Sequence, residues 1–125
     1  MKRLTILMAM LIATSGWAYD ELDLIKFKSI NQCMGCDLSG ADLRNGDFRN
    51  ADLKNANLTN VNFSEAKLGY ANLVNANLSG ANLKKANLER AKLDEANLTE
   101  ANFHDAWIYF ASFREAYLSK VNFSS

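Results

Sequence analysis

Residues 71–88 read ANLVNANLSGANLKKANL, so that Ala, Asn and Leu return every five residues. Counted in fives from Cys36, this pattern continues without a slip to Ser125 and makes 18 pentads. The first position is Ala in 14 pentads, and the third is Leu in 12, Phe in 5 and Ile in one. The second is Asn in 9 and Asp in 4, whereas the fourth and fifth are mixed and mostly polar. The same local structure is therefore expected to repeat once per pentad along residues 36–125.

A period of five fits neither regular secondary structure. In an α-helix, a Leu every five residues would step by about 140° and wind around the whole cylinder. In a straight strand, five is odd, so successive Leu residues would alternate between faces. Within one pentad, however, Ala and Leu are two residues apart and point the same way when the chain is extended. If the next two residues turn a corner, the chain coils as a solenoid whose repeats bury their apolar faces by stacking.

The pattern resembles the A(D/N)LXX motif of the pentapeptide-repeat proteins, and the resemblance covers residues 36–125 without a gap. It implies an all-β fold, a right-handed quadrilateral β-helix with four pentads per coil and therefore about 4.5 coils. With coils about 4.8 Å apart, the rod would be on the order of 22 Å long. Leu or Phe would fill the axis, and Asn or Asp would satisfy backbone groups at the turns and stack in ladders between coils.

Residues 1–18, MKRLTILMAMLIATSGWA, are predicted to be a signal peptide rather than part of the fold. They begin with two basic residues, continue with an apolar run over residues 4–13 and end in a small-x-small triplet. The alternative, a membrane anchor, would need about 20 apolar residues. We expect cleavage after Ala18, a periplasmic or secreted location, and no membrane association after cleavage.

Residues 19–35 are predicted to be an N-terminal capping segment. In DELDLIKFKSI, residues 20–30, acidic residues come first and lysines come late, which suits the dipole of a helix. A broad apolar side is supplied by Leu22, Leu24, Ile25, Phe27 and Ile30. Eleven residues make a weak helix alone, so we expect a short capping helix that is held by docking on the first coil.

Cys33 and Cys36 form a C-x-x-C motif directly before the first pentads. In an oxidising periplasm a disulfide is chemically reasonable. The alternative is that Cys36 is a free thiol that fills the small first position of its pentad. A thioredoxin-like redox centre would need a βαβ context, and two Cys alone do not make a zinc site, which takes four ligands. We therefore expect no metal and no cofactor.

Aromatic residues gather in the outer positions near the C-terminus, where residues 106–118 read AWIYFASFREAYL. With four pentads per coil, Tyr70, Trp107, Tyr109 and Phe110 would lie on one face, and Tyr117 follows in a second position. Exposed aromatic patches mark contact surfaces, so these five residues are the candidate interface. The alternative is that the rings fold over the open end as a self-made cap. Some family members pair through their C-termini, so the resemblance favours a homodimer through this end.

No catalytic residue is predicted. His104 has no Ser or Cys partner at a recognisable spacing. The Asp residues at four consecutive second positions should point to different faces, which favours turn capping over a cation site; they are Asp37, Asp42, Asp47 and Asp52. Without residues 1–18 the chain has 12 basic and 14 acidic side chains, a net charge of −2, which gives no reason to expect nucleic acid as a partner.

The leading hypothesis is a non-enzymatic scaffold or protein-binding module of the bacterial cell envelope, with an unidentified protein partner. A second hypothesis follows from family members that imitate duplex DNA and protect DNA gyrase. That role needs a strongly acidic rod, whereas residues 36–125 carry 10 basic and 11 acidic residues, a net of −1. Export would also separate the protein from gyrase. A third hypothesis is a redox protein that uses Cys33 and Cys36.

Overall fold

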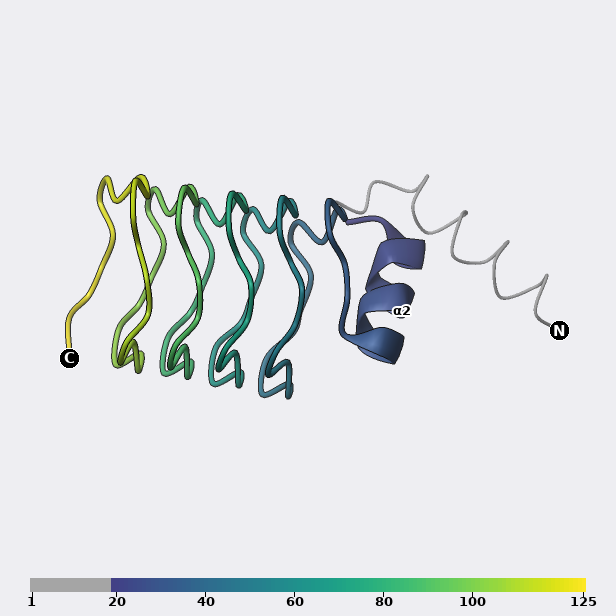
Figure 1. The fold of residues 1–125 in the computed structure, drawn as a ribbon, viewed down its shortest axis with the longest axis horizontal. Helices are drawn as coiled ribbons and strands as arrows, with labels where there is room; N and C mark the ends of the chain where they lie inside the picture. Colours follow the sequence, from purple (N-terminus) through teal and green to yellow (C-terminus); the bar gives the residue numbers. More distant parts are fainter. Residues whose placement is uncertain (1–18) are drawn as a thin grey trace, which may run out of the picture.

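The computed structural model describes residues 19–125 as one short helix followed by a stack of coils (Figure 1). Helix α2 spans Glu21–Ile30 and lies against the first coil, and the C-terminus lies at the opposite end of the stack. The signal peptide predicted for residues 1–18 lies outside the described residues. Across residues 19–125 no helix has the length and apolar character needed to cross a bilayer.

The chain completes one coil every twenty residues. Residues at second positions form parallel β-bridges with residues twenty positions later, from Gln32–Asp52 to Asn102–Asn122. Twenty residues are four pentads, so each coil has four sides. Each side pairs through a single bridge rather than a continuous strand, because the chain turns a corner after every few residues.

The corners are built by the fifth and second positions. Fifth-position residues adopt a left-handed backbone conformation, which Gly40 with φ 71° and Asn55 with φ 61° tolerate well. Every Asn and Asp at a second position accepts the N–H of the fourth residue at Oδ1; Thr59 N–H to Asn57 Oδ1, for example, is 3.2 Å. This confirms the turn-capping role predicted for these side chains.

The core is the axis of the rod. Third-position Leu and Phe residues and first-position Ala residues are buried from the first coil as far as Phe103, and Leu78 and Leu83 have an exposed fraction of 0%. Burying each Leu contributes about 2 kcal/mol. At Gly46, a Cβ atom would lie only 2.2 Å from the ring of Phe48. Glycine there leaves room for Phe48, which stacks on Phe27 of α2 with 4.8 Å between ring centroids.

Helix α2 covers the N-terminal end of the stack. Its N-cap is Asp20, whose carboxylate accepts the N–H of Leu22 at 2.8 Å and of Asp23 at 3.2 Å. On its inner face Leu24 and Phe27 are buried in the common core. The Asp23 carboxylate also accepts the N–H of Asp37, at 2.8 Å, so the helix is tied to the first coil by both packing and polar contacts.

The sequence pattern placed the start of the coils at Cys36. In the structure the first side of the coil begins five residues earlier, at Asn31. Gln32 bridges to Asp52, and Gly35 N–H donates to the carbonyl of Lys54 at 2.9 Å. Residues 31–35 thus behave as a pentad inside the segment predicted to be only a cap. The pattern hides this side because Asn31 and Cys33 stand where Ala and Leu stand elsewhere.

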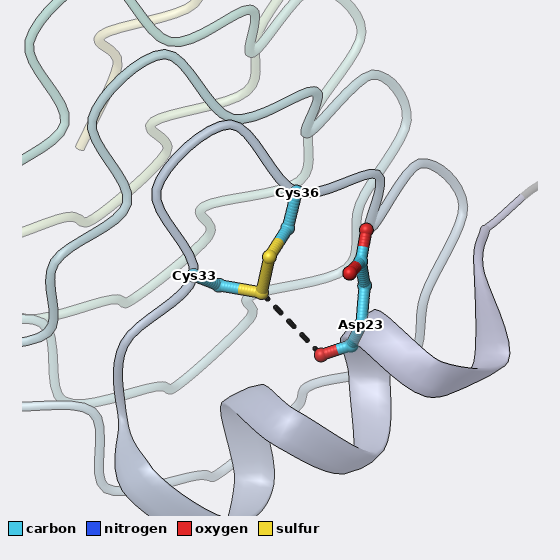
Figure 2. Close-up of side chains that lie close together, drawn as sticks. All are labelled: Asp23, Cys33 and Cys36. Atoms are coloured by element: carbon cyan, nitrogen blue, oxygen red, sulfur yellow. Dashed lines mark hydrogen bonds between the residues drawn. A yellow bond between two sulfur atoms is a disulfide. The ribbon is translucent and has the colours of Figure 1, made fainter.

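Cys33 and Cys36 are joined in a disulfide, with 5.1 Å between their Cα atoms. They occupy a third position and the following first position, the two places where Leu and Ala meet at other corners. The backbone turn is the same too, because Cys36 N–H donates to the carbonyl of Cys33 at 3.1 Å and Ala71 N–H to that of Leu68 at 3.0 Å. Both cysteines are buried at the joint between α2 and the first coil (Figure 2).

Candidate interaction surface

Four of the five predicted interface residues lie on one side of the rod. Lys67, Asn87 and Trp107 are linked by successive bridges, so pentads 66–70, 86–90 and 106–110 share a side, which we call the aromatic side. It carries Tyr70, Trp107, Tyr109 and Phe110, with exposed fractions of 53%, 63%, 70% and 78%. The period of five, combined with four pentads per coil, thus placed these residues together correctly.

Tyr117 belongs elsewhere. It bridges to Asn97, and it follows Trp107 by ten residues, which is half a coil. Its ring is 67% exposed and lies on the side opposite Trp107. The two residues share only the last coil, residues 106–125. A partner that contacts the whole candidate interface must therefore cover the C-terminal end of the rod as well as the aromatic side.

Arg90 lies between two rings of the aromatic side. Its guanidinium carbon is 5.7 Å from the ring centroid of Tyr70 and 5.3 Å from that of Phe110. The three residues occupy fifth positions of successive coils, and all have positive φ, of 61°, 57° and 57° in chain order. Cation–π contacts of this kind contribute about 0.5–1 kcal/mol each at exposed sites. Arg90 is not among the residues predicted for the interface, although the twenty-residue register places it between Tyr70 and Phe110 at fifth positions.

An open groove lies beside the aromatic side near the C-terminus. It encloses about 1150 Å³ and is lined by Ala106, Trp107, Ile108 and Tyr109, with Lys85, Asp105 and Ser125 at its polar edge. Such an apolar floor with a few polar groups is typical of a binding surface.

The last coil also exposes third-position side chains that are buried elsewhere. Ile108, Leu118 and Phe123 are 36%, 43% and 46% exposed. The rings of Trp107, Tyr109 and Tyr117 are more than 60% exposed, so they do not fold over these side chains as a lid. This geometry favours a contact surface over the self-made cap.

The four Asp residues at consecutive second positions do separate, as expected. Asp37, Asp42, Asp47 and Asp52 bridge to residues in four different columns. Asp42 pairs with Arg44, and Asp47 accepts Arg49 Nε at 2.8 Å and a terminal guanidinium nitrogen at 2.6 Å. These hydrogen bonds from Arg49 are the main reason that the pKa of Asp47 falls to about 2. All four carboxylates cap turns, and those of Asp42 and Asp47 also pair with arginines.

His104 has neighbours that the sequence did not reveal. Ser124 Oγ lies 2.9 Å from His104 Nδ1, and Asp105 Oδ2 lies 3.3 Å from His104 Nε2. Ser124 follows His104 by twenty residues, one full coil, which is not a spacing typical of catalytic partners. The side chains of His104 and Asp105 are 35% and 39% exposed at an outer corner, whereas a catalytic triad keeps its carboxylate buried. The contact is best explained as a rung between successive fourth positions.

The comparisons with known proteins agree with the repeat architecture. The family model described as pentapeptide repeat region matches residues 28–103 and 46–123. The chain belongs to the pentapeptide repeat family. This confirms the resemblance drawn from the A(D/N)LXX pattern and the repeat solenoid that the resemblance implies. No curated protein matches the chain.

Solved structures that are similar to this chain include two pentapeptide repeat proteins. HetL, a pentapeptide repeat protein involved in heterocyst differentiation regulation in the cyanobacterium Nostoc sp. strain PCC 7120, is 30% identical with a TM-score of 0.64. The match covers 65% of this chain but only 38% of HetL. A pentapeptide repeat protein of the Arabidopsis thaliana thylakoid lumen is 34% identical with a TM-score of 0.51, over 69% of this chain and 61% of that one.

A third likeness shows the fold alone. QnrB1, a plasmid-mediated fluoroquinolone resistance protein, is 18% identical with a TM-score of 0.51, over 70% of this chain and 48% of QnrB1. Family members with this rod therefore differ in their roles, and a shared fold does not assign any one of those roles to this chain.

Proposed function

We propose that the protein is a non-enzymatic pentapeptide-repeat scaffold that binds protein in the bacterial cell envelope. Its rod is a right-handed quadrilateral β-helix, with about 4.5 coils in residues 36–125, one more side formed by residues 31–35, and α2 as its N-terminal cap. The observation that carries the proposal is the set of exposed rings on the last coil. Stiff repeat rods commonly serve as binding surfaces, and exposed aromatic residues are enriched at contact sites.

These rings do not serve the corners at which they occur. Trp107 and Tyr117 replace the Asn or Asp whose oxygen accepts the N–H of the fourth residue elsewhere, and an aromatic side chain offers no such acceptor. Phe110 holds a left-handed conformation that is costly for a bulky residue. Each substitution therefore lowers local stability, which is explained if the rings serve a contact instead.

The proposed partner is a second copy of the chain, which contacts the coil formed by residues 106–125. This contact would cover Trp107 and Tyr117 together, although they lie on opposite sides, because both belong to that coil. It would also remove the exposed parts of Leu118 and Phe123 from water, which is favourable by about 25 cal/mol for each Å² of apolar surface.

Location outside the cytoplasm is supported by two observations. Residues 1–18 have the three-part pattern of a signal peptide, and a family member that is 34% identical is found in a thylakoid lumen. If the pattern is used, protein recovered from the periplasm or medium of a bacterial host will begin at Tyr19 by mass spectrometry. Recovery only from the cytoplasm, with residues 1–18 intact, would contradict this part of the proposal.

The decisive experiment is the solution mass of the purified protein, measured by light scattering over a range of concentrations. It should be run beside a variant with Trp107→Ser, Tyr109→Ser and Phe110→Asn, where Asn suits the left-handed position. We expect a dimer that becomes a folded monomer in this variant.

A matched control changes the same second and fourth positions on another side, with Asn72→Ser and Val74→Ser. This control should remain a dimer. A wild-type monomer at every concentration would overturn the second copy as partner. A dimer that survives in the triple variant would remove Trp107, Tyr109 and Phe110 from the interface.

A further inference from the structure

The joint between α2 and the first coil brings three metal-binding side chains together. Cys33 Sγ, Cys36 Sγ and a carboxylate oxygen of Asp23 all lie within 4.8 Å of one another. Figure 2 shows Asp23 on the helix beside the two cysteines of the turn that follows it. Only the two cysteines could be recognised from the sequence, because Asp23 lies on the helix, ten residues before Cys33.

We propose that the reduced form of this joint binds one thiophilic divalent cation, such as Zn²⁺, through Cys33, Cys36 and Asp23. Zinc sites use Cys pairs spaced by two to four residues, together with His or carboxylate ligands. Zn–S distances of about 2.3 Å and Zn–O distances of about 2.1 Å place neighbouring ligands of a tetrahedral ion roughly 3.5–4 Å apart. After reduction the two sulfur atoms separate to reach that spacing, and solvent supplies the fourth ligand.

The surroundings of Asp23 favour this role. Its carboxylate is partly buried and is oriented by the N–H of Asp37, which donates to Oδ2 at 2.8 Å. A hydrogen bond of this kind fixes the direction of a carboxylate ligand, as outer partners do in established metal sites. Asp23 is also less buried than the two cysteines, so an ion can reach the site from its side.

The disulfide and the metal exclude each other. A dithiol reductant gives two electrons and two protons to the Cys33–Cys36 bond and becomes a disulfide itself, which leaves two thiols. The cation then displaces both thiol protons and binds the thiolates, because the thiolate is the ligand. Cys33 Sγ is 3.4 Å from the carbonyl oxygen of Asp23, a contact that becomes a hydrogen bond only when the sulfur carries a proton.

The proposed site gives the joint between α2 and the first coil two cross-linked forms. In one form the disulfide closes the turn that follows the helix, and in the other a metal ion joins that turn to the helix itself. The metal form adds a bond between Asp23 and the first coil that the disulfide form lacks. This inference does not depend on the dimer proposed above, because the joint lies at the other end of the rod.

The test is a titration of the reduced protein with Co²⁺ under anaerobic conditions, after a phosphine reductant has been removed. Tetrahedral thiolate coordination of Co²⁺ gives visible absorption bands and a thiolate charge-transfer band. We expect these bands to saturate at one ion per chain, to be competed away by Zn²⁺, and to be absent from the oxidised protein and from Cys36→Ser.

Asp23→Asn tests the third ligand. Asn keeps an oxygen that can accept the Asp37 N–H, so the helix stays docked, but it removes the charge that binds the cation. Affinity should fall at least about tenfold, the scale on which even outer-shell partners act. Asp20→Asn is the matched control, because Asn is an equally good N-cap and Asp20 is not one of the three ligands. No saturable binding, equal binding by oxidised protein, or unchanged affinity in Asp23→Asn would each overturn the proposal.

Discussion

The two ends of the rod are finished in different ways. At the N-terminal end, α2 places Leu24 and Phe27 over the first coil, and Phe27 is only 1% exposed. At the C-terminal end, Leu118 and Phe123 occupy the same kind of core position as Leu78 but are 43% and 46% exposed, whereas Leu78 is fully buried. A third-position residue is therefore buried by the coils on both sides of it and not by its own pentad, as in other stacked repeats.

Truncation of one ring at each end tests this difference in burial. Phe27→Ala should lower the free energy of unfolding by about 3–5 kcal/mol, because it opens a cavity between α2 and Phe48. In the monomeric triple variant, Phe123→Ala should cost at most about 1.5 kcal/mol, because 46% of the residue is exposed in the single chain. Urea denaturation followed by circular dichroism measures both values.

Leu22→Ala is the control for Phe27→Ala. Leu22 lies on the outward face of α2 and is 44% exposed, so its loss changes the same helix with little loss of packing. If Leu22→Ala and Phe27→Ala destabilise equally, the helix does not stabilise the rod through its docked face.

The disulfide offers the next largest effect, again at the N-terminal end. Cys36→Ala places the usual first-position residue in the corner and removes only the cross-link, which for such a short loop should cost about 2 kcal/mol. Reduced wild-type protein, without metal, should show the same loss in urea. In denaturant without reductant, a thiol assay should find no free thiol in the wild type, and finding two would contradict the disulfide.

Much of the fold follows from the sequence because the pentad acts locally. Ala and Leu are two residues apart and point to the same face of an extended segment, and Asn at the second position caps the turn of its own pentad. The backbone conformation of each pentad is therefore set by residues within that pentad. The left-handed fifth position was readable too, since Gly40, Asn45 and Asn50 are the residues that tolerate it. What the pattern did not show is the side formed by residues 31–35, where the motif residues are replaced.

The site was predictable only where the register of twenty residues was applied. It brought Tyr70 to the same side as Trp107, but it was not applied to Arg90 or to the pair His104 and Ser124. These contacts join residues that are twenty positions apart and touch through stacking of coils, so short motifs along the chain do not indicate them, whereas the twenty-residue register does. Asp23 was missed for a different reason, because its position depends on how α2 docks.

Arg90 tests whether stacking between coils continues towards the open end. Arg90→Gln removes the cation between Tyr70 and Phe110 and should cost about 1–2 kcal/mol, from two cation–π contacts. Arg114→Gln is the matched control, an Arg of the last coil that does not lie between two rings. The midpoints of urea denaturation give both values, and equal effects would show that the ring stack adds nothing to stability.

The smallest expected effect is the pH dependence of the arginine-paired Asp residues, which lie towards the N-terminal end. The pKa of Asp47 falls from 3.8 to about 2, mainly because Arg49 donates hydrogen bonds to its carboxylate. Since the folded pKa lies below the unfolded one, the pair stabilises the fold above about pH 3.8, and this contribution is lost as the pH falls towards 2.

Asp47→Asn isolates this effect, because Asn can still accept the Arg49 N–H at the turn but cannot form the ion pair. At pH 5 the variant should melt less than about 3 °C below the wild type, since exposed pairs are weak, and the difference should vanish near pH 2. Arg49→Gln should show the same convergence, because it removes the other half of the pair. A gap between wild type and Asp47→Asn that widens on acidification would reverse the sign and exclude this origin.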